Sequence, residues 1–383
     1  MSYTATSILG NFSVTKFLTN LTLAAILWLL ILQAFQFLRK CIHFRRIEQT
    51  IPGPFSVPFF GSVFWLSLNA DNCLEKILDS VKPYWPGLVR YSAFNKLHVM
   101  VNDADHIAKV LRDRHFSDKP WMFYGPLKPI IRDGIFTSNG EPWQAHRLVI
   151  TPTFHAEVMG RYVEILDMEA KEFVDKLSGM LHKDVDCSDT MIRTASFMAI
   201  RTMMSSTLNE RECSILEEII SLVPRALKSV NRRSLNPFLW PDWIFKWTQM
   251  YRDTEAAKTL FDMLINSIIQ RKSSEIHATA SRERQLASKL GFRDRKSLLD
   301  LLLESKFSGE LRMTDEDILN ETSTMFITAF DTPVIVVTFV LKVLSIRPDI
   351  QELVYAEICD VLQEKDHKLS SDDLSRWAIY NNT

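Results

Sequence analysis

Cysteines are few and scattered in this 383-residue sequence, and no two of them form a C-x-x-C pair. They are Cys41, Cys73, Cys187, Cys213 and Cys359. Because disulfide frameworks and structural zinc sites need closely spaced cysteines, we expect neither, and we expect reduced thiols in a cytosol-facing domain. The histidines are isolated and no H-E-x-x-H occurs, so the sequence predicts no metal site made of its own side chains.

Glycine is also rare, with 11 residues in the chain and none after Gly309. Neither a G-x-G-x-x-G motif nor a Walker loop is present, so nucleotide chemistry has no support in the sequence. Lysine and arginine together number 45, against 46 aspartates and glutamates, which leaves a net charge of −1. This balance argues against nucleic acid as the main partner, because nucleic-acid-binding domains are strongly basic.

One long apolar run occupies residues 17–38, with no charged residue inside it. About 20 apolar residues suffice for a helix to cross a bilayer, so we predict a membrane anchor. Only Lys16 precedes the run, whereas several basic residues follow it, namely Arg39, Lys40, Arg45 and Arg46. The positive-inside rule then places residues 1–16 in the lumen and the rest in the cytosol. A cleaved signal peptide is the alternative, but basic sequence rather than small residues follows the run.

Prolines and glycines crowd the next segment, Ile51-Pro52-Gly53-Pro54, with Pro58 and Gly61 close behind. Each proline fixes φ and glycine permits a turn, so residues 39–61 are predicted to form a basic, proline-rich hinge. Beyond the hinge, residues 88–102 alternate like two short strands, and residues 160–275 have mostly helical periodicity. The sequence therefore predicts a mainly α domain with a small β element over residues 62–383.

The longest predicted helix covers about residues 314–346. Thr314 can cap its first backbone N–H groups, and the helix should end at Arg347, which precedes a proline. After Thr324 the side chains are apolar on nearly every side, a pattern typical of a helix that is buried all round.

A polar pair, Asp331-Thr332, interrupts this helix halfway, and Pro333 follows at once. Because proline cannot donate its backbone hydrogen bond, we expect a bend there, with Thr332 bonding a carbonyl one turn back. A carboxylate in an apolar core is costly unless it is paired or functional. The pair either performs chemistry or only satisfies the broken backbone, and the pattern leaves both interpretations open.

A second candidate site lies on the helix predicted to begin near residue 140. Trp143 and Arg147 are four residues apart and share one helix face. Arg147 could bind an anion through its guanidinium group, and Trp143 through its indole N–H. The alternative is an amphipathic helix with a surface arginine. The preceding loop, residues 115–133, is rich in aromatic residues and prolines, as are many lids over apolar pockets and many loops that are simply packed.

Taken in order, these segments resemble the cytochrome P450 family of haem-thiolate monooxygenases. The hinge IPGPFSVPFFG is similar to that of microsomal members, and GIFTSNGEPWQAHRLVITPTFH resembles the family's third helix with its W-x-x-x-R. Residues 298–333 resemble the start of its central helix. The T-P-T-F-H and D-L-L-L-E strings look like the clan of fatty-acid ω-hydroxylases, including insect members. The resemblance implies a P450 fold, single-pass in the endoplasmic reticulum membrane with a cytosolic catalytic domain.

The resemblance also implies roles for individual residues. Haem would be the cofactor, with Trp143 and Arg147 holding a propionate and Ala329 beside the oxygen groove. Asp331 and Thr332 would relay protons to dioxygen. The side chains that would face the substrate are Trp121, Phe123, Phe326 and Phe330. Electrons would come from a membrane-bound flavoprotein reductase that uses NADPH, and the substrate would be apolar, such as a fatty acid, hydrocarbon, hormone or xenobiotic.

The sequence departs from the family at two places. The central motif [AG]-G-x-[DE]-T reads Thr328-Ala329-Phe330-Asp331-Thr332, and Thr328 replaces the glutamate that links covalently to haem in many ω-hydroxylases, so we predict no such link. The family's E-x-x-R and F-x-x-G-x-R-x-C motifs do not follow the central helix. We therefore expect a C-terminally truncated P450 with a partly uncovered central helix. The alternative is a truncated, non-catalytic, membrane-tethered relative that acts as a binding or regulatory module or is an inactive product.

Overall fold

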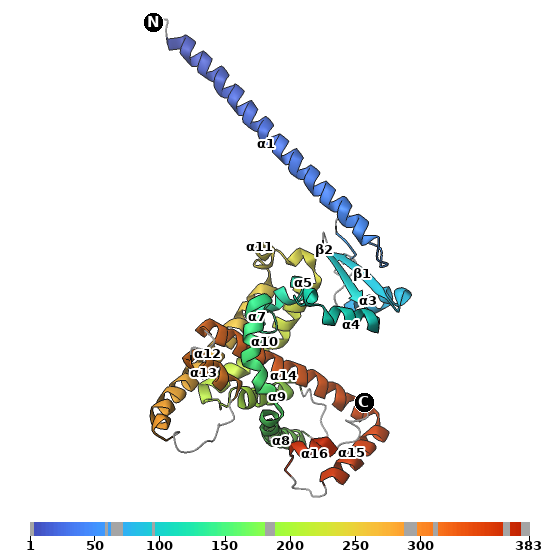
Figure 1. Cartoon of the computed structure of the whole chain (residues 1–383), viewed down its shortest axis with the longest axis vertical. Helices are drawn as coiled ribbons and strands as arrows, with labels where there is room; N and C mark the ends of the chain where they lie inside the picture. The colour runs from blue at the N-terminus through green and yellow to red at the C-terminus, as the bar shows by residue number, and fades with distance from the viewer. Residues whose placement is uncertain are drawn as a thin grey trace. The chain divides into compact units, whose positions relative to one another are not determined.

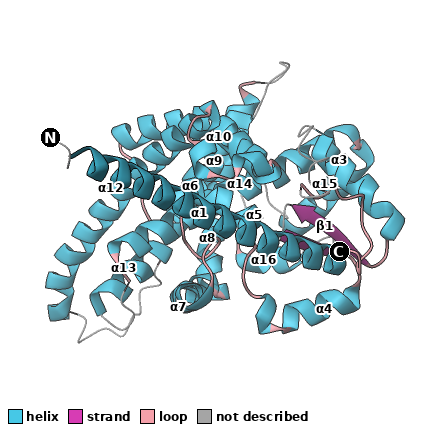
Figure 2. Ribbon diagram, turned by 90° about the horizontal axis from the view of Figure 1, so that it is seen from above, coloured by secondary structure: helices cyan, strands magenta, loops and turns pink. Residues whose placement is uncertain are grey.

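The computed structural model describes residues 4–57, 60–62, 72–93, 96–180, 188–286, 297–308, 313–362 and 368–376. The chain divides into two units. Unit 1 comprises residues 1–116 and 235–237, and unit 2 comprises residues 117–234 and 238–383. Helices dominate the described part, and its one sheet is a two-stranded hairpin (Figure 2), with isolated β-bridges from Gly61 to Val57 and Ala93. The prediction of a mainly α fold with a small β element is confirmed.

The N-terminal apolar run forms the middle of α1, Thr4–Glu48, a single long helix (Figure 1). Its side chains are exposed from residue 16 to residue 40. Its portion Lys16–Glu48 is long and apolar enough to cross a membrane. The only other described helix that meets this test is α14, Asp315–Ile346, which differs from α1 because its first half lies in the protein core. The segment boundaries predicted at residues 16, 38 and 61 stay predictions.

Unit 1 is organised around the predicted hairpin, with β1 (Leu88–Ala93) antiparallel to β2 (Lys96–Val101). The end of α1 is joined to β1 by Glu48, which is buried: its Oε1 accepts hydrogen bonds from Ser92 Oγ at 2.5 Å and Arg90 Nη1 at 3.2 Å. The other elements of this unit are α3 (Cys73–Val81), η2 (Lys82–Tyr84), α4 (Ala104–Arg112) and η3 (Arg114–Phe116). The side chain of Asp103 caps α4 as predicted.

Unit 2 is helical throughout its described part. Its first elements are α5 (Trp121–Tyr124), η4 (Gly125–Leu127), α6 (Lys128–Ile131), α7 (Gly140–Ile150), η5 (Thr151–Phe154), α8 (Ala156–Ser178) and α9 (Ser188–Met203). The later elements are α10 (Glu210–Leu235), η6 (Pro237–Leu239), α11 (Asp242–Phe245), α12 (Gln249–Leu286), α13 (Leu298–Ser308), α14, α15 (Pro348–Leu362) and α16 (Ser371–Arg376). The last residue of α10 and the first of η6 are assigned to unit 1. α14 packs along α9 and also against α12, α13, α6 and α15.

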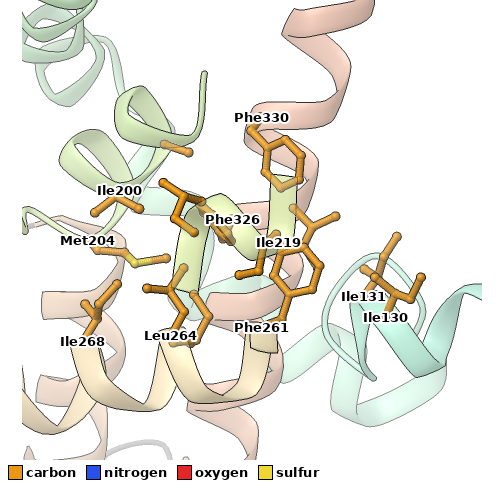
Figure 3. Close-up of a cluster of buried hydrophobic side chains, with 14 of the residues drawn as sticks. Ile130, Ile131, Ile200, Met204, Ile219, Phe261, Leu264, Ile268, Phe326 and Phe330 are labelled. Atoms are coloured by element: carbon orange, nitrogen blue, oxygen red, sulfur yellow. The ribbon is translucent and has the colours of Figure 1, made fainter. Parts of the chain in front are cut away.

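The core of unit 2 lies where the first half of α14 meets α9, α10 and α12 (Figure 3). Phe326 and Phe330 of α14 are 0% and 2% exposed, and both pack against the ring of Phe261 on α12. α14 begins as predicted: Thr314 and Asp317 form a capping box that satisfies its first N–H groups. The helix runs without interruption through Pro333 and ends at Ile346.

The second half of α14 corrects the prediction of all-round burial. Its side chains are largely exposed, including Ile335 at 51% and Phe339 at 63%. The reason is that the described elements cover only part of this half, which borders an apolar groove between α8, α9 and α14. The expectation of a partly uncovered central helix is therefore confirmed. The predicted bond from Thr332 is not made within the described residues; Thr328 Oγ1 instead donates to the carbonyl of Thr324 at 2.9 Å.

Candidate functional site

A cluster of two cations around one indole lies at the start of α7. The guanidinium carbon of Arg147 and the Nζ of Lys119 each lie 5.0 Å from the centre of the Trp143 ring. The predicted pairing of Trp143 with Arg147 on one face is confirmed, although the two cations meet the ring and not the indole N–H. Lys119 is held in place, because its Nζ donates to the carbonyl of Ser138 at 2.7 Å. We call these three residues the α7 cationic cluster.

The α7 cationic cluster has the electrostatics of an anion site. Arg147 is exposed and has no carboxylate partner within the described ranges. Burial lowers the pKa of Lys119, and the positive charge of Arg147 acts in the same direction, whereas the carboxylates of Asp118 and Glu321 oppose this shift. Two cations near each other repel unless an anion lies between or beside them. Sequence reasoning missed Lys119, since no local pattern links it to a helix that begins some 20 residues later.

A buried ion pair fastens α7 to α14. His146 Nδ1 lies 2.7 Å from Glu321 Oε1, and its Nε2 lies 3.7 Å from Asp317 Oδ1. The other oxygen of Glu321 accepts the backbone N–H of Ile135 at 2.9 Å. Glu321 is 0% exposed and His146 is 8% exposed, so water does not compete for these bonds. The hydrogen bond to Glu321 raises the pKa of His146, which favours the imidazolium form.

Further polar contacts lie on the same face of α14. Thr324 Oγ1 donates to the carbonyl of Ile131 at 2.7 Å, and Asn320 Oδ1 accepts from Arg132 Nη1 at 3.2 Å. With Asp317 and Glu321 they follow the spacing i, i+3, i+4, i+7 that puts side chains on one helix face. Sequence reasoning missed this polar stripe, which could have been found from the spacing alone. It indicates a face of α14 that holds residues 131–146 rather than lipid or core.

Asp331 lies half-buried and lines a very small apolar pocket formed mainly by α10, α12 and α14. Burial raises the pKa of its carboxyl group above the ordinary range. Within the described residues its carboxylate has neither a hydrogen bond nor an ion pair. Thr332, the next residue, is exposed, so the two side chains point to different surroundings. Their joint role in proton transfer stays a prediction.

The side chains expected to face the substrate fall into two separate groups. Phe326 and Phe330 lie in the core, with their ring centres 5.3 Å apart. Trp121 lies on α5 in an edge contact with Trp240, 5.8 Å between ring centres, and Phe123 on the same short helix is 46% exposed. No described cavity joins the two groups. Their role in a substrate pocket stays a prediction, as does that of the half-buried Ala329 beside the oxygen groove.

Comparisons with known proteins agree on one family. A family model described as "Cytochrome P450" matches residues 51–382. "Cytochrome P450 4c21" of Blattella germanica is 28% identical over 86% of this chain and 66% of its own length. "Cytochrome P450 4d2" of Drosophila melanogaster is 27% identical over 84% and 64%, respectively. "Cytochrome P450 4V2" of Homo sapiens is 25% identical over 88% and 65%.

A solved structure supports the same fold. The heme domain of a cytochrome P450DA mutant superposes with a TM-score of 0.62 at 19% identity, over 85% of this chain and 67% of that one. The chain spans about two-thirds of the length of the curated relatives it matches. Because the family model covers most of the sequence, the match does not depend on one short motif. The chain belongs to the cytochrome P450 family.

Proposed function

We propose that this chain is the membrane-anchored part of a haem-dependent monooxygenase that hydroxylates an apolar substrate with dioxygen and electrons from NADPH. The observation that carries the proposal is the α7 cationic cluster. It combines the family's W-x-x-x-R residues with Lys119 in a half-exposed site, where Arg147 has no carboxylate partner within the described residues. Such a site suits a carboxylate-bearing cofactor such as haem, whose propionates would accept from both cations.

The residues present fit one side of haem and not the other. The α7 cationic cluster can hold a propionate, and Ala329 and Thr332 lie on a part of α14 that is only partly covered. On the opposite side the family places a cysteine thiolate, and its F-x-x-G-x-R-x-C motif is not among the 383 residues. Cys359, the last cysteine, lies exposed on α15 next to Tyr355. We therefore derive no step that passes through the iron.

Haem, when bound, supplies the activation of dioxygen. The chain's own residues would bind and orient it and manage protons. Lys119 and Arg147 would neutralise a propionate. The raised pKa of Asp331 suits a carboxyl group that holds and releases a proton, and the exposed hydroxyl of Thr332 would be a second proton carrier. Trp121, Phe123, Phe326 and Phe330 would exclude water from an apolar substrate.

The partners and the location belong to the same proposal. Electrons would come from a flavoprotein reductase in the same membrane, and α1 would keep the chain in the endoplasmic reticulum. A fatty acid, hydrocarbon, hormone or xenobiotic would fit the apolar side chains named above. A second candidate function is a non-catalytic, membrane-tethered binding module.

The test uses the full chain in lipid nanodiscs. Haem and its dimethyl ester are titrated into the wild type, Arg147→Ala and Arg211→Ala, the last being an exposed arginine on α10. We expect the wild type to bind haem at least about tenfold more tightly than the ester, as for other charge-assisted pairs, and Arg147→Ala to lose this preference. Equal affinity for the two ligands in the wild type would refute the proposed site.

Turnover separates the two candidate functions. Haem-loaded chain is supplied with reductase, NADPH and a mixture of fatty acids and hydrocarbons. Hydroxylated product together with a thiolate absorption signature would exclude the non-catalytic module. Haem binding without that signature and without product would exclude catalysis by this chain alone.

A further inference from the structure

Trp143 and Arg147 are the two members of the α7 cationic cluster that lie on α7 itself, whereas Lys119 precedes α5. Arg147 is exposed and Trp143 is only half-buried, so core packing does not hold either side chain. α7 is 11 residues long, and its buried residues are His146 and Ile150. His146 is adjacent to Arg147 and three residues from Trp143, so a shift of His146 moves both. The position of the cluster therefore depends on what holds His146.

The shortest contact of the His146 imidazole is with the carboxylate of Glu321, at 2.7 Å, whereas Asp317 lies farther away at 3.7 Å. Glu321 accepts from the imidazole of His146 on α7 and from the N–H of Ile135 in the segment before α7. Gly134, next to Ile135, packs so tightly that an added Cβ would lie 2.2 Å from Thr324 Oγ1. Glu321 thus fixes α7 and its entrance to the same turn of α14, ten residues before Asp331.

The charges that act on His146 come from α14 and from the segment before α7. Glu321 and Asp317 on α14 and Asp133 before α7 all favour its protonated form. Lys119 lies close enough to Glu321 for the two charges to interact. α13 also packs against α7, but its Asp300 and Lys306 form ion pairs elsewhere, with Lys272 and Asp315. Loss of the proton from His146 therefore leaves Glu321 buried without a full counter-charge.

We propose that Glu321 and His146 are positioning residues: they hold the α7 cationic cluster in register with α14, so that affinity for a carboxylate ligand depends on the protonation of His146. This inference rests on the proposed function of the cluster. Neither residue contacts the ligand. Their effect passes through the geometry of α7, in the way that partners behind a ligand-binding side chain orient it.

Substitution of Glu321 separates positioning from simple charge effects. Glu321→Gln removes a negative charge near Lys119, so electrostatics alone predicts tighter binding of an anion. Positioning predicts the opposite, because the amide has a single acceptor oxygen and cannot accept from both the imidazole of His146 and the N–H of Ile135, which leaves one of these donors unpaired. We expect about tenfold weaker binding of metal-free protoporphyrin, a dicarboxylate, and unchanged binding of its dimethyl ester. Tighter binding of the dicarboxylate would overturn the inference.

The matched variants are His146→Gln and Glu141→Gln, the second being an exposed carboxylate on the same helix. We expect the wild-type preference for the dicarboxylate to fall by about tenfold between about pH 6 and pH 9. In His146→Gln the preference should be low and independent of pH, and Glu141→Gln should behave as the wild type. A wild-type pH profile in His146→Gln would refute the positioning role.

Amide hydrogen exchange gives a readout that needs no ligand. In the full chain in nanodiscs, the N–H of Ile135 and those of α7 should exchange about tenfold faster in Glu321→Gln and His146→Gln, after correction for intrinsic rates. Unchanged exchange in both variants would overturn the inference even if no porphyrin binds.

If Arg147→Ala leaves the preference for the dicarboxylate intact, the proposed anion site itself fails. If Arg147→Ala abolishes that preference while both positioning variants retain it, only the positioning role fails.

Discussion

Gly134 is the position where a single methyl group should disturb the site most. An added Cβ would lie 2.2 Å from Thr324 Oγ1, 2.8 Å from Thr324 Cβ and 2.9 Å from the carbonyl oxygen of Asn320. Two of these three atoms belong to a fully buried threonine and one to helix backbone, so none can move away freely. The φ of Gly134 is not in the left-handed region, so Gly134→Ala tests close approach and not backbone strain.

We expect Gly134→Ala to destabilise unit 2 by about 2 kcal/mol, in the range measured for overpacked cores, which corresponds to a fall in Tm of about 4–8 °C. Thermal unfolding of the full chain in nanodiscs, followed by far-UV circular dichroism, measures this. The control is Gly179→Ala at the end of α8, where an added Cβ meets only the carbonyl oxygen of Lys176 at 3.5 Å. That change should stay within about 0.5 kcal/mol.

A double substitution shows whether the cause is the contact with Thr324. Thr324→Ala removes the Oγ1 that lies 2.2 Å from the added methyl group, so Gly134→Ala should cost about 1 kcal/mol less in that background. If Gly134→Ala is no more destabilising than Gly179→Ala, the segment before α7 does not approach α14 as closely as described. The geometry on which the positioning of α7 depends would then be wrong.

Three further predictions concern the core and the titrating groups. Phe326→Ala, at a side chain with 0% exposure, should cost about 3–5 kcal/mol in denaturant unfolding, whereas Phe339→Ala at 63% exposure should cost far less. Because Glu321 raises the pKa of His146 above 6.5, the pair's contribution to stability should be complete below about pH 6.5. It should be lost as pH rises through the folded-state pKa, so the Tm difference between wild type and His146→Gln should shrink with pH. Burial raises the pKa of Asp331, so the ionised form destabilises the fold: Asp331→Asn should raise Tm at neutral pH, with a gain that vanishes as pH falls toward 3.8.

Local signals explain why the bounds of α14 were predictable. Thr314 and Asp317 form the capping box within one turn, and Arg347 ends the helix before Pro348. Both signals involve residues only a few positions apart, so the start and the end of the helix can be predicted from the sequence alone. The pairing of Trp143 with Arg147 was predictable for the same reason, since a spacing of four residues puts two side chains on one helix face.

Burial along α14 was not predictable from its pattern. Phe330 and Phe339 are equally apolar, yet the first is 2% exposed and the second 63%. The hydropathy of a side chain shows that its burial would be favourable in free energy. It does not show whether another element of the fold is present to cover that side chain. Phe330 is buried because α12 places Phe261 against it. Phe339 lies in the half of α14 that borders the open groove beside α8 and α9.

The sequence by itself determined the family resemblance, the membrane-length helix α1, the start and end of α14 and the shared face of Trp143 and Arg147. These features depend on composition or on contacts within one or two helical turns. Only the tertiary structure brought Lys119 to the Trp143 ring and placed Glu321 between His146 and Ile135. Those contacts join residues 24 and 175–186 positions apart, and which distant residues meet depends on how all the helices pack, not on any local pattern.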